Sequence, residues 1–315
     1  MHKTAKYIFL LILLTILGPV LTRGQAQQFP EGILFLAEDF IFNYELSVPE
    51  KKTKLPSELR EISGIQLLDD GRIAAIEDEH GKVYIIEFSS GEIKEKIRFG
   101  DNGDYEGIAI VDNNAWILKS NGNLYRVKDF QKGEEKLKTK KYETGLSKKN
   151  DTEGLAYDRG NHQLLIACKG HPHINEKDGT HQKAIYSFDI ENKILNPDPI
   201  LIIELDTLKD LKDYNLFSSL GIRIMSYFDE NKGDVTFQPS DIAVHPISGN
   251  YYIISAVGDL LLVYSPGGKL LAVVTLADSI FKQAEGICFD TDGDLYISNE
   301  GGEGKANILK FNPKD

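Results

Sequence analysis

The chain has 315 residues, of which 41% are hydrophobic and 27% charged, and its formal net charge is −12. This composition is that of a globular protein with a sizeable core. The excess of acid argues against nucleic acid as a partner, because binding to phosphates depends on lysine and arginine. It suits cations, or a partner that carries no charge.

Residues 1–24 have the pattern of a signal peptide, with a basic start, an apolar stretch at residues 7–21 and a polar stretch after it. The apolar stretch is short for a membrane-spanning helix, which needs about 20 residues. We therefore expect an exported protein, periplasmic or secreted. An uncleaved anchor at residues 7–21, which would associate the protein with a membrane, is the alternative. Residues 25–43 form a mixed N-terminal segment, in which we expect a short helix near residues 33–42.

One short pattern recurs along residues 44–315, which we expect to form one domain. Each copy begins with Ser or Glu, continues with Gly or Asp and an apolar residue, and runs through a turn into a second apolar strand. The copies open at Ser63, Glu106, Glu153, Ser240 and Glu285. A period of roughly 40–45 residues with several strands in each unit is typical of a β-propeller.

The predicted fold is all-β, a five-bladed propeller. The fifth unit lacks a fourth strand, and a lone strand at residues 44–55 can supply it and so close the ring. The gap between the third and fourth units is longer than the others, which leaves a six-bladed ring as the alternative. Residues 206–230 carry apolar residues near helical spacing, so we expect a helical insertion after the third blade.

The first strand of each propeller blade lines the central channel, so equivalent residues converge at one mouth. Two residues before the repeat openings, on the same face of an extended chain, stand Glu61, Asp104, Asp151, Gln238 and Gln283. Like charges gathered at such a mouth raise one another's pKa, and a bound cation relieves that cost. The ring offers only oxygen ligands, which favours Ca²⁺ over Mg²⁺ and Zn²⁺.

We expect the metal ligands among the repeat openings and the aspartate that follows one of them: Glu106, Glu153, Glu285, Ser63, Ser240 and Asp241. Residues at the ends of the second strands form a supporting set of mixed charge at the same mouth: Glu77, Asp78, Lys119, Lys169, Ser255, Asn299 and Glu300. These side chains could orient a ligand over the ion, although salt bridges to the acids are the commoner arrangement. The alternative for the whole ring is that Glu-Gly-Ile recurs for folding reasons alone.

Cys168 and Cys288 are the only cysteines, and each lies within an apolar strand. We interpret them as two separate buried thiols. An exported compartment would also permit a disulfide, and the sequence alone does not decide the pairing.

The segments ELREISGI, GDYEGIAI, NDTEGLAYD, FQPSDIAVHP and QAEGICFDTDGDLYISNEGG occur in this order. With them the chain resembles the SdiA-regulated (YjiK-like) family over roughly residues 44–313. The resemblance implies an exported or membrane-associated bacterial protein, a five-bladed propeller distantly similar to NHL repeats, and a calcium site. Glu106, Glu153 and Glu285 match the family's Glu-Gly-Ile/Leu positions. Ser63 and Ser240 depart from glutamate, which leaves the full ligand set open.

Three functions follow from these patterns. The first is a calcium-binding module or scaffold that holds a small molecule, a glycan or a protein at the mouth. The second is a metal-dependent hydrolase of phosphodiesterase, esterase or lactonase type, in which Glu106, Glu153 or Glu285 would act as base. The third is an ion that only holds the ring closed. The chain has no nucleophile elbow and no phosphate-binding loop motif.

Overall fold

The computed structural model describes residues 32–132, 137–174, 181–208 and 237–314. The chain divides into two units, Met1–Pro30 and Glu31–Asp315, and every described residue belongs to the second. The signal peptide predicted at residues 1–24 lies outside the described residues and stays a prediction. Within the described ranges, no helix has the length and apolar character needed to cross a membrane.

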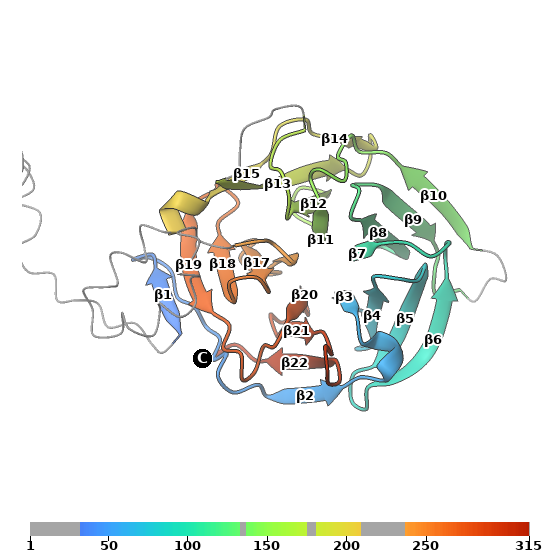
Figure 1. Ribbon diagram of the computed structural model, residues 1–315, viewed down its shortest axis with the longest axis horizontal. Coiled ribbons are helices and arrows are strands. Elements are labelled where there is room, and N and C mark those ends of the chain that lie inside the picture. The colour runs from blue at the N-terminus through green and yellow to red at the C-terminus, as the bar shows by residue number, and fades with distance from the viewer. Residues whose placement is uncertain (1–31, 133–136, 175–180, 209–236, 315) are drawn as a thin grey trace, which may run out of the picture. The chain divides into compact units, whose positions relative to one another are not determined.

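The described strands form five antiparallel sheets that radiate from a central axis (Figure 1). The first blade contains β3 (Ile62–Leu67), β4 (Ile73–Glu77), β5 (Lys82–Glu87) and β6 (Glu92–Arg98). The second contains β7 (Tyr105–Val111), β8 (Asn114–Lys119), β9 (Leu124–Lys128) and β10 (Lys138–Tyr142). The third contains β11 (Thr152–Asp158), β12 (Gln163–Cys168) and β13 (Gln182–Asp189), and its outer edge is divided between β14 (Ile194–Leu195) and β15 (Leu201–Glu204).

The last two blades complete the ring. The fourth contains β16 (Asp241–Val244), β17 (Tyr251–Ser255), β18 (Leu260–Tyr264) and β19 (Leu270–Thr275). The fifth contains β20 (Ala284–Phe289), β21 (Leu295–Asn299) and β22 (Asn307–Phe311). Each inner strand neighbours the next around the axis, and β20 of the fifth blade returns to β3 of the first. The ring is therefore closed with five blades, and the six-bladed alternative is wrong.

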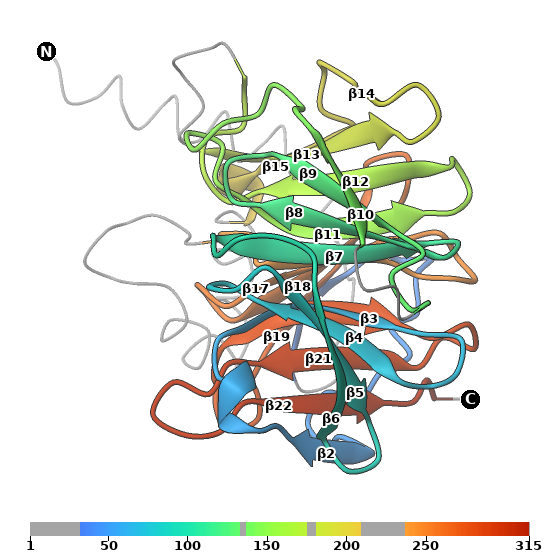
Figure 2. The same ribbon diagram turned by 90° about the vertical axis from the view of Figure 1, so that its right-hand side faces the viewer.

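The fifth blade takes its outer strand from the N-terminal side of the chain, as the sequence predicts. The strand β2 (Lys51–Lys54) pairs antiparallel with β22 (Figure 2). An isolated bridge also joins Tyr44 to Pro313. The two ends of the propeller domain thus lie in one sheet. The closure of the ring therefore depends on the contact between β2 and β22.

The prediction of a short helix near residues 33–42 is wrong. Ile33–Leu36 forms β1, which pairs with β19 and adds a fifth strand to the outer edge of the fourth blade. Phe35 packs against the apolar clusters on both sides of this blade, so tertiary contact decides the conformation. After the third blade, residues 205–208 are helical, and the rest of the insertion predicted at 206–230 falls outside the described residues.

The glycine of the repeated motif is required by close contact between inner strands. A Cβ atom at Gly154 would lie 2.8 Å from the amide nitrogen of Ile242 in the next blade. Gly64, Gly107 and Gly286 face the following blade in the same way. The motif therefore carries a folding requirement at its second position, while the side chain at its first position remains available for the channel.

The fourth blade has Asp241 where the other four have glycine. Its carboxylate is buried and accepts hydrogen bonds from the amides of Leu155 (3.2 Å), Ile242 (2.8 Å) and Ile287 (2.9 Å). These three amides belong to the third, fourth and fifth blades. Asp241 thus links three inner strands at the junction where no glycine allows direct contact.

Apolar side chains fill the space between adjacent blades in five clusters, one at each junction. Cys168 lies in the cluster between the second and third blades, and Cys288 in the cluster between the fifth and first. Both are free, buried thiols, which confirms the interpretation of two separate cysteines.

Candidate functional site

The start of the inner strands surrounds a cavity of about 280 Å³ at one mouth of the axis. Every blade contributes to it. The lining consists of carboxylates, hydroxyls, one amide and one lysine: Ser63, Asp78, Asp104, Glu106, Asp151, Glu153, Lys169, Ser240, Gln283, Glu285 and Glu300. We call this the axial cavity. All of these positions are ones that the repeat pattern placed at the mouth.

Burial and repulsion between neighbouring acids disfavour the charged form of two of these side chains, Glu106 and Glu300. Burial, with the nearby charges of Glu153 and Asp104, raises the pKa of Glu106 well above its usual range. Burial, together with the charges of Glu285 and Glu61, raises the pKa of Glu300 to about 8. Burial and the charges of neighbouring acids therefore disfavour the ionised form of Glu106 and Glu300.

Lys169 is the one cationic side chain in the lining of the axial cavity. Its Nζ lies 2.9 Å from Oε1 of Glu153. Burial raises the pKa of Glu153, and the charge and hydrogen bond of Lys169 lower it again. Lys169 thus neutralises part of one wall. Burial raises the pKa of Glu285 in the fifth blade, and the charge of Lys169 lowers it in part.

Neighbouring polar groups orient several of the acids. Gln283 donates a hydrogen bond of 3.3 Å to Oε1 of Glu285, and Ser120 donates one to the carboxylate of Asp104. Asp151 has a φ of 48°, in the left-handed region that aspartate tolerates better than most residues. The two hydrogen bonds restrain the carboxylates of Glu285 and Asp104. Ser120 is a supporting residue that the repeat pattern did not identify.

Several residues predicted for the mouth do not line the axial cavity. Asp241 lies beneath it, with its oxygens bound to backbone amides. Asn299 is fully buried and donates a hydrogen bond of 3.1 Å to Asn307. Lys119 places its ammonium group 4.9 Å from the ring centre of Tyr105. Glu61 is also absent from the lining, although its charge raises the pKa of Asp78 and Glu300.

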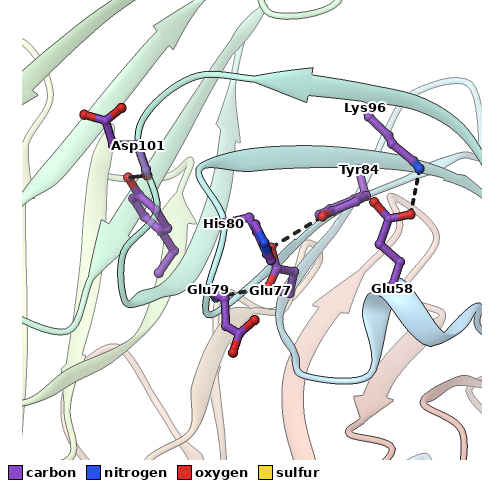
Figure 3. Close-up of polar contacts among 8 residues, drawn as sticks. Glu58, Glu77, Glu79, His80, Tyr84, Lys96 and Asp101 are labelled. Atoms are coloured by element: carbon purple, nitrogen blue, oxygen red, sulfur yellow. Dashed lines mark hydrogen bonds and ion pairs between the residues drawn. The ribbon is translucent and has the colours of Figure 1, made fainter.

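Glu77 belongs to a separate hydrogen-bonded turn beside the mouth (Figure 3). One oxygen of this buried carboxylate lies 2.9 Å from Nδ1 of His80 and 3.4 Å from the hydroxyl of Tyr84, while the other accepts the amide of Glu79. Among the described residues, Glu77, Glu79 and His80 form the group whose potential metal ligands all lie within 4.8 Å of one another. Because the oxygens of Glu77 already have donors, we interpret this group as a stabilised turn.

The fold and the cavity define a class, a five-bladed propeller with an acidic axial site. The chain belongs to the SdiA-regulated family, whose model matches residues 41–217, more than half of the chain. The sequence resemblance is thereby confirmed, although the match ends before the fourth and fifth blades. A comparison with curated protein sequences finds no match.

Many solved structures are similar to this chain. Glutaminyl cyclase from Myxococcus xanthus superposes with a TM-score of 0.52 at 11% identity, covering 85% of this chain and 96% of that one. A gluconolactonase from Xanthomonas campestris gives a TM-score of 0.49 at 11% identity, covering 80% of this chain and 72% of that one. At such identities the likeness is one of fold alone.

Proposed function

We propose that the protein is an exported calcium-binding propeller that acts as a binding module or scaffold, with its ligand held at the axial mouth. The observation that carries the proposal is the lining of the axial cavity, where seven carboxylates face a single lysine. The ligand is a small molecule, a glycan or a protein. Export rests on the pattern of residues 1–24, and recovery of a periplasmic form cleaved near residue 24 would test it.

The residues of the axial cavity fit a hard cation. The lining offers carboxylate and hydroxyl oxygens and contains no histidine or cysteine, which suits Ca²⁺ better than Zn²⁺. Glu106, Glu153 and Glu285 would hold the ion, with Ser63 and Ser240 as the serine contributions of the other two blades. Ca²⁺ also accepts water among its ligands, which suits carboxylates spread around a wide ring. We assign Asp241 to the support of the ring, because its oxygens are engaged by amides.

Thermal unfolding in EDTA, followed by addition of Ca²⁺, Mg²⁺ or Zn²⁺, tests the ion. Ca²⁺ at 100 times its Kd is expected to stabilise the fold by about 2.7 kcal/mol. Glu106→Gln and Glu285→Gln should each remove most of this gain. Glu92→Gln, which removes one carboxylate from the outer strand β6, is the matched control. Equal responses of all variants, or no response to any cation, would contradict the calcium site.

A hydrolase is the second candidate, and the position of Lys169 favours it. This ammonium group lies in the lining beside Glu153, where it could hold the anionic part of a phosphodiester, an ester or a lactone. When bound, Ca²⁺ would polarise the substrate. Lys169→Gln should then abolish turnover of a responsive substrate while the stabilisation by Ca²⁺ persists. If Ca²⁺ stabilises the protein but no such substrate is turned over, the result favours the binding module over the hydrolase.

The third candidate, an ion that only holds the ring closed, is separated by Glu153→Gln. For a structural ion, this change should lower the melting temperature and leave binding of an identified ligand intact. For a functional ion, ligand binding or turnover should fall in protein that is still folded. Circular dichroism of the variant provides the check that folding is retained.

A further inference from the structure

Three cationic side chains gather at the junction of the second and third blades, away from the axial cavity. Arg126 lies on β9, Lys140 on the outer strand β10, and Lys193 in the turn between β13 and β14 (Figure 1). We call these three residues the basic notch. The strand β12 runs toward the axial mouth and β13 runs back from it, so the turn with Lys193 lies at the opposite end of the blade.

The strand register places two of these cations directly opposite each other. Trp116 on β8 pairs with Arg126, and Arg126 pairs with Lys140, so all three side chains share one face of the sheet. Like charges in directly opposed positions destabilise an antiparallel pair. Lys193 approaches the same face from the next blade, at a residue whose φ of 59° is in the left-handed region. The arrangement brings three positive charges together at a cost in stability.

Two aromatic rings lie beneath the cations. The rings of Trp116 and Tyr142 stack with centroids 5.3 Å apart, and both side chains are buried. The guanidinium carbon of Arg126 lies 5.9 Å from the ring of Trp116, Lys193 Nζ 5.7 Å from the same ring, and Lys140 Nζ 5.0 Å from the ring of Tyr142. The ring faces attract the cations and hold them in place.

Acidic side chains do not balance this charge in the described part of the chain, where none of the three cations has a carboxylate within ion-pair distance. Asp189 and Glu191 act on Lys193 electrostatically, but Asp189 is engaged by the amides of Glu191 (2.8 Å) and Asn192 (2.9 Å). Burial, with the charge of Arg126, lowers the pKa of Lys193. Nε of Arg126 is buried and finds no acceptor among the described residues.

We propose that the basic notch binds a doubly charged oxyanion, a phosphate or sulfate group, either free or carried on a larger ligand. Three positive charges from three segments converge there, which favours a dianion over a single carboxylate. The guanidinium fork of Arg126 matches two oxygens of such a group, and a bound oxygen would supply the acceptor that its Nε lacks. An anion would also remove the repulsion between Arg126 and Lys140. This site is independent of the axial cavity.

The chain contains a single tryptophan, and it is the one that lies under the notch. The emission of Trp116 therefore reports on the site directly. Titration with inorganic phosphate or sulfate at constant ionic strength should give a saturable change, and chloride should give none. Arg126→Gln and Lys193→Gln should weaken the response at least tenfold. Lys141→Gln, which removes a charge from the other face of β10, is the matched control and should respond as the parent does.

Two further measurements keep the test decisive. Each variant should retain the circular dichroism of the parent, and phosphate should raise the melting temperature of the parent and of Lys141→Gln but not of Arg126→Gln. A tighter response to glucose 6-phosphate than to inorganic phosphate would assign the notch to a group carried on a larger ligand, and equal responses to the free ion. A response that does not saturate, that chloride reproduces, or that survives Arg126→Gln in folded protein overturns the proposal.

Discussion

The axial cavity gathers acidic side chains and the basic notch gathers cationic ones, and the two regions differ in how they tolerate the repulsion between like charges. Both bring like charges together, one at the axis and one at the junction of two blades. The acids of the axial cavity can take up protons, and burial with mutual repulsion raises the pKa of Glu106 and Glu300 accordingly. In the notch, the guanidinium group of Arg126 lies near the rings of Trp116 and Tyr142, whose faces attract the cation. The axial site should therefore respond to pH and cations, and the notch to anions.

The largest expected effect comes from replacing Asp241, because its carboxylate links the inner strands of three blades around the axis. Asp241→Ala leaves three buried amides without an acceptor, and each such loss costs about 1–3 kcal/mol. We expect a total destabilisation of about 3 kcal/mol or more, measured by denaturant unfolding in EDTA. Stabilisation by Ca²⁺ should also weaken, because the inner strands of three blades lose their common link.

Asp241→Asn is the control for this change. It retains one oxygen, and with it an acceptor for the amides of Leu155 and Ile242, while the contact with Ile287 is lost. One of three contacts is lost, so the loss should be about 1–3 kcal/mol, roughly a third of that for alanine. If both variants unfold like the parent, Asp241 does not support the ring, and its place among the direct metal ligands would have to be reconsidered.

The repeat pattern predicted the propeller and the composition of the axial cavity, because both depend on position within a blade. Residues two apart on an inner strand share a face, and equivalent residues of five blades meet at the axis. The closing strand, predicted at residues 44–55 and found at Lys51–Lys54, was predictable for the same reason, since the fifth unit lacked one strand. The sequence did not show that the glycine of the motif faces the next blade, or that Asp241 at the equivalent position instead accepts hydrogen bonds from the amides of neighbouring blades.

Contacts between blades set the limit of prediction from sequence. The strand β1 resembled a helix because its partner β19 lies more than 200 residues away, and no local pattern reveals such a pairing. The sequence did not predict the basic notch, for the same reason. Lys193 and Trp116 are far apart in sequence, and the opposition of Arg126 and Lys140 depends on the register of two strands. Local spacing predicted that acids gather at the axis and did not predict that cations gather between two blades.

A change of pH should alter the contribution that the acids of the axial cavity make to the free energy of unfolding. An acid whose folded pKa is raised stabilises the fold below its unfolded pKa, near 4.3, and loses that contribution as the pH rises through the folded value. For Glu300 the folded pKa is about 8. In EDTA, the free energy of unfolding should therefore fall by about 2 kcal/mol between pH 5 and pH 8, a value reduced for screening by solvent.

Calcium and one variant identify the source of this pH dependence. Saturating Ca²⁺ should flatten the fall, because the ion favours the charged carboxylates. Glu300→Gln should flatten it in part without Ca²⁺, whereas Glu92→Gln on the outer strand β6 should not. Denaturant unfolding at a series of pH values measures both effects. A stability that rises from pH 5 to pH 8 in EDTA would contradict the assignment of these acids as a strained cluster.

The smallest expected effect concerns the notch, where the removal of a charge should stabilise the protein. Lys140→Gln removes the cation opposite Arg126 and keeps a side chain of similar length on β10. Relief of a cross-strand like-charge pair is worth about 0.2–1 kcal/mol. We therefore expect the free energy of unfolding to rise by about 0.5 kcal/mol in a low-salt buffer that contains neither phosphate nor sulfate. Lys141→Gln, which breaks an ion pair with Glu143 on the other face, should give no gain. Because salt screens exposed charges, the difference between the two variants should shrink at 1 M NaCl. A loss of stability in Lys140→Gln at low salt would mean that attraction to the ring of Tyr142 outweighs the repulsion, and the notch would then be a stable surface feature with no need of an anion.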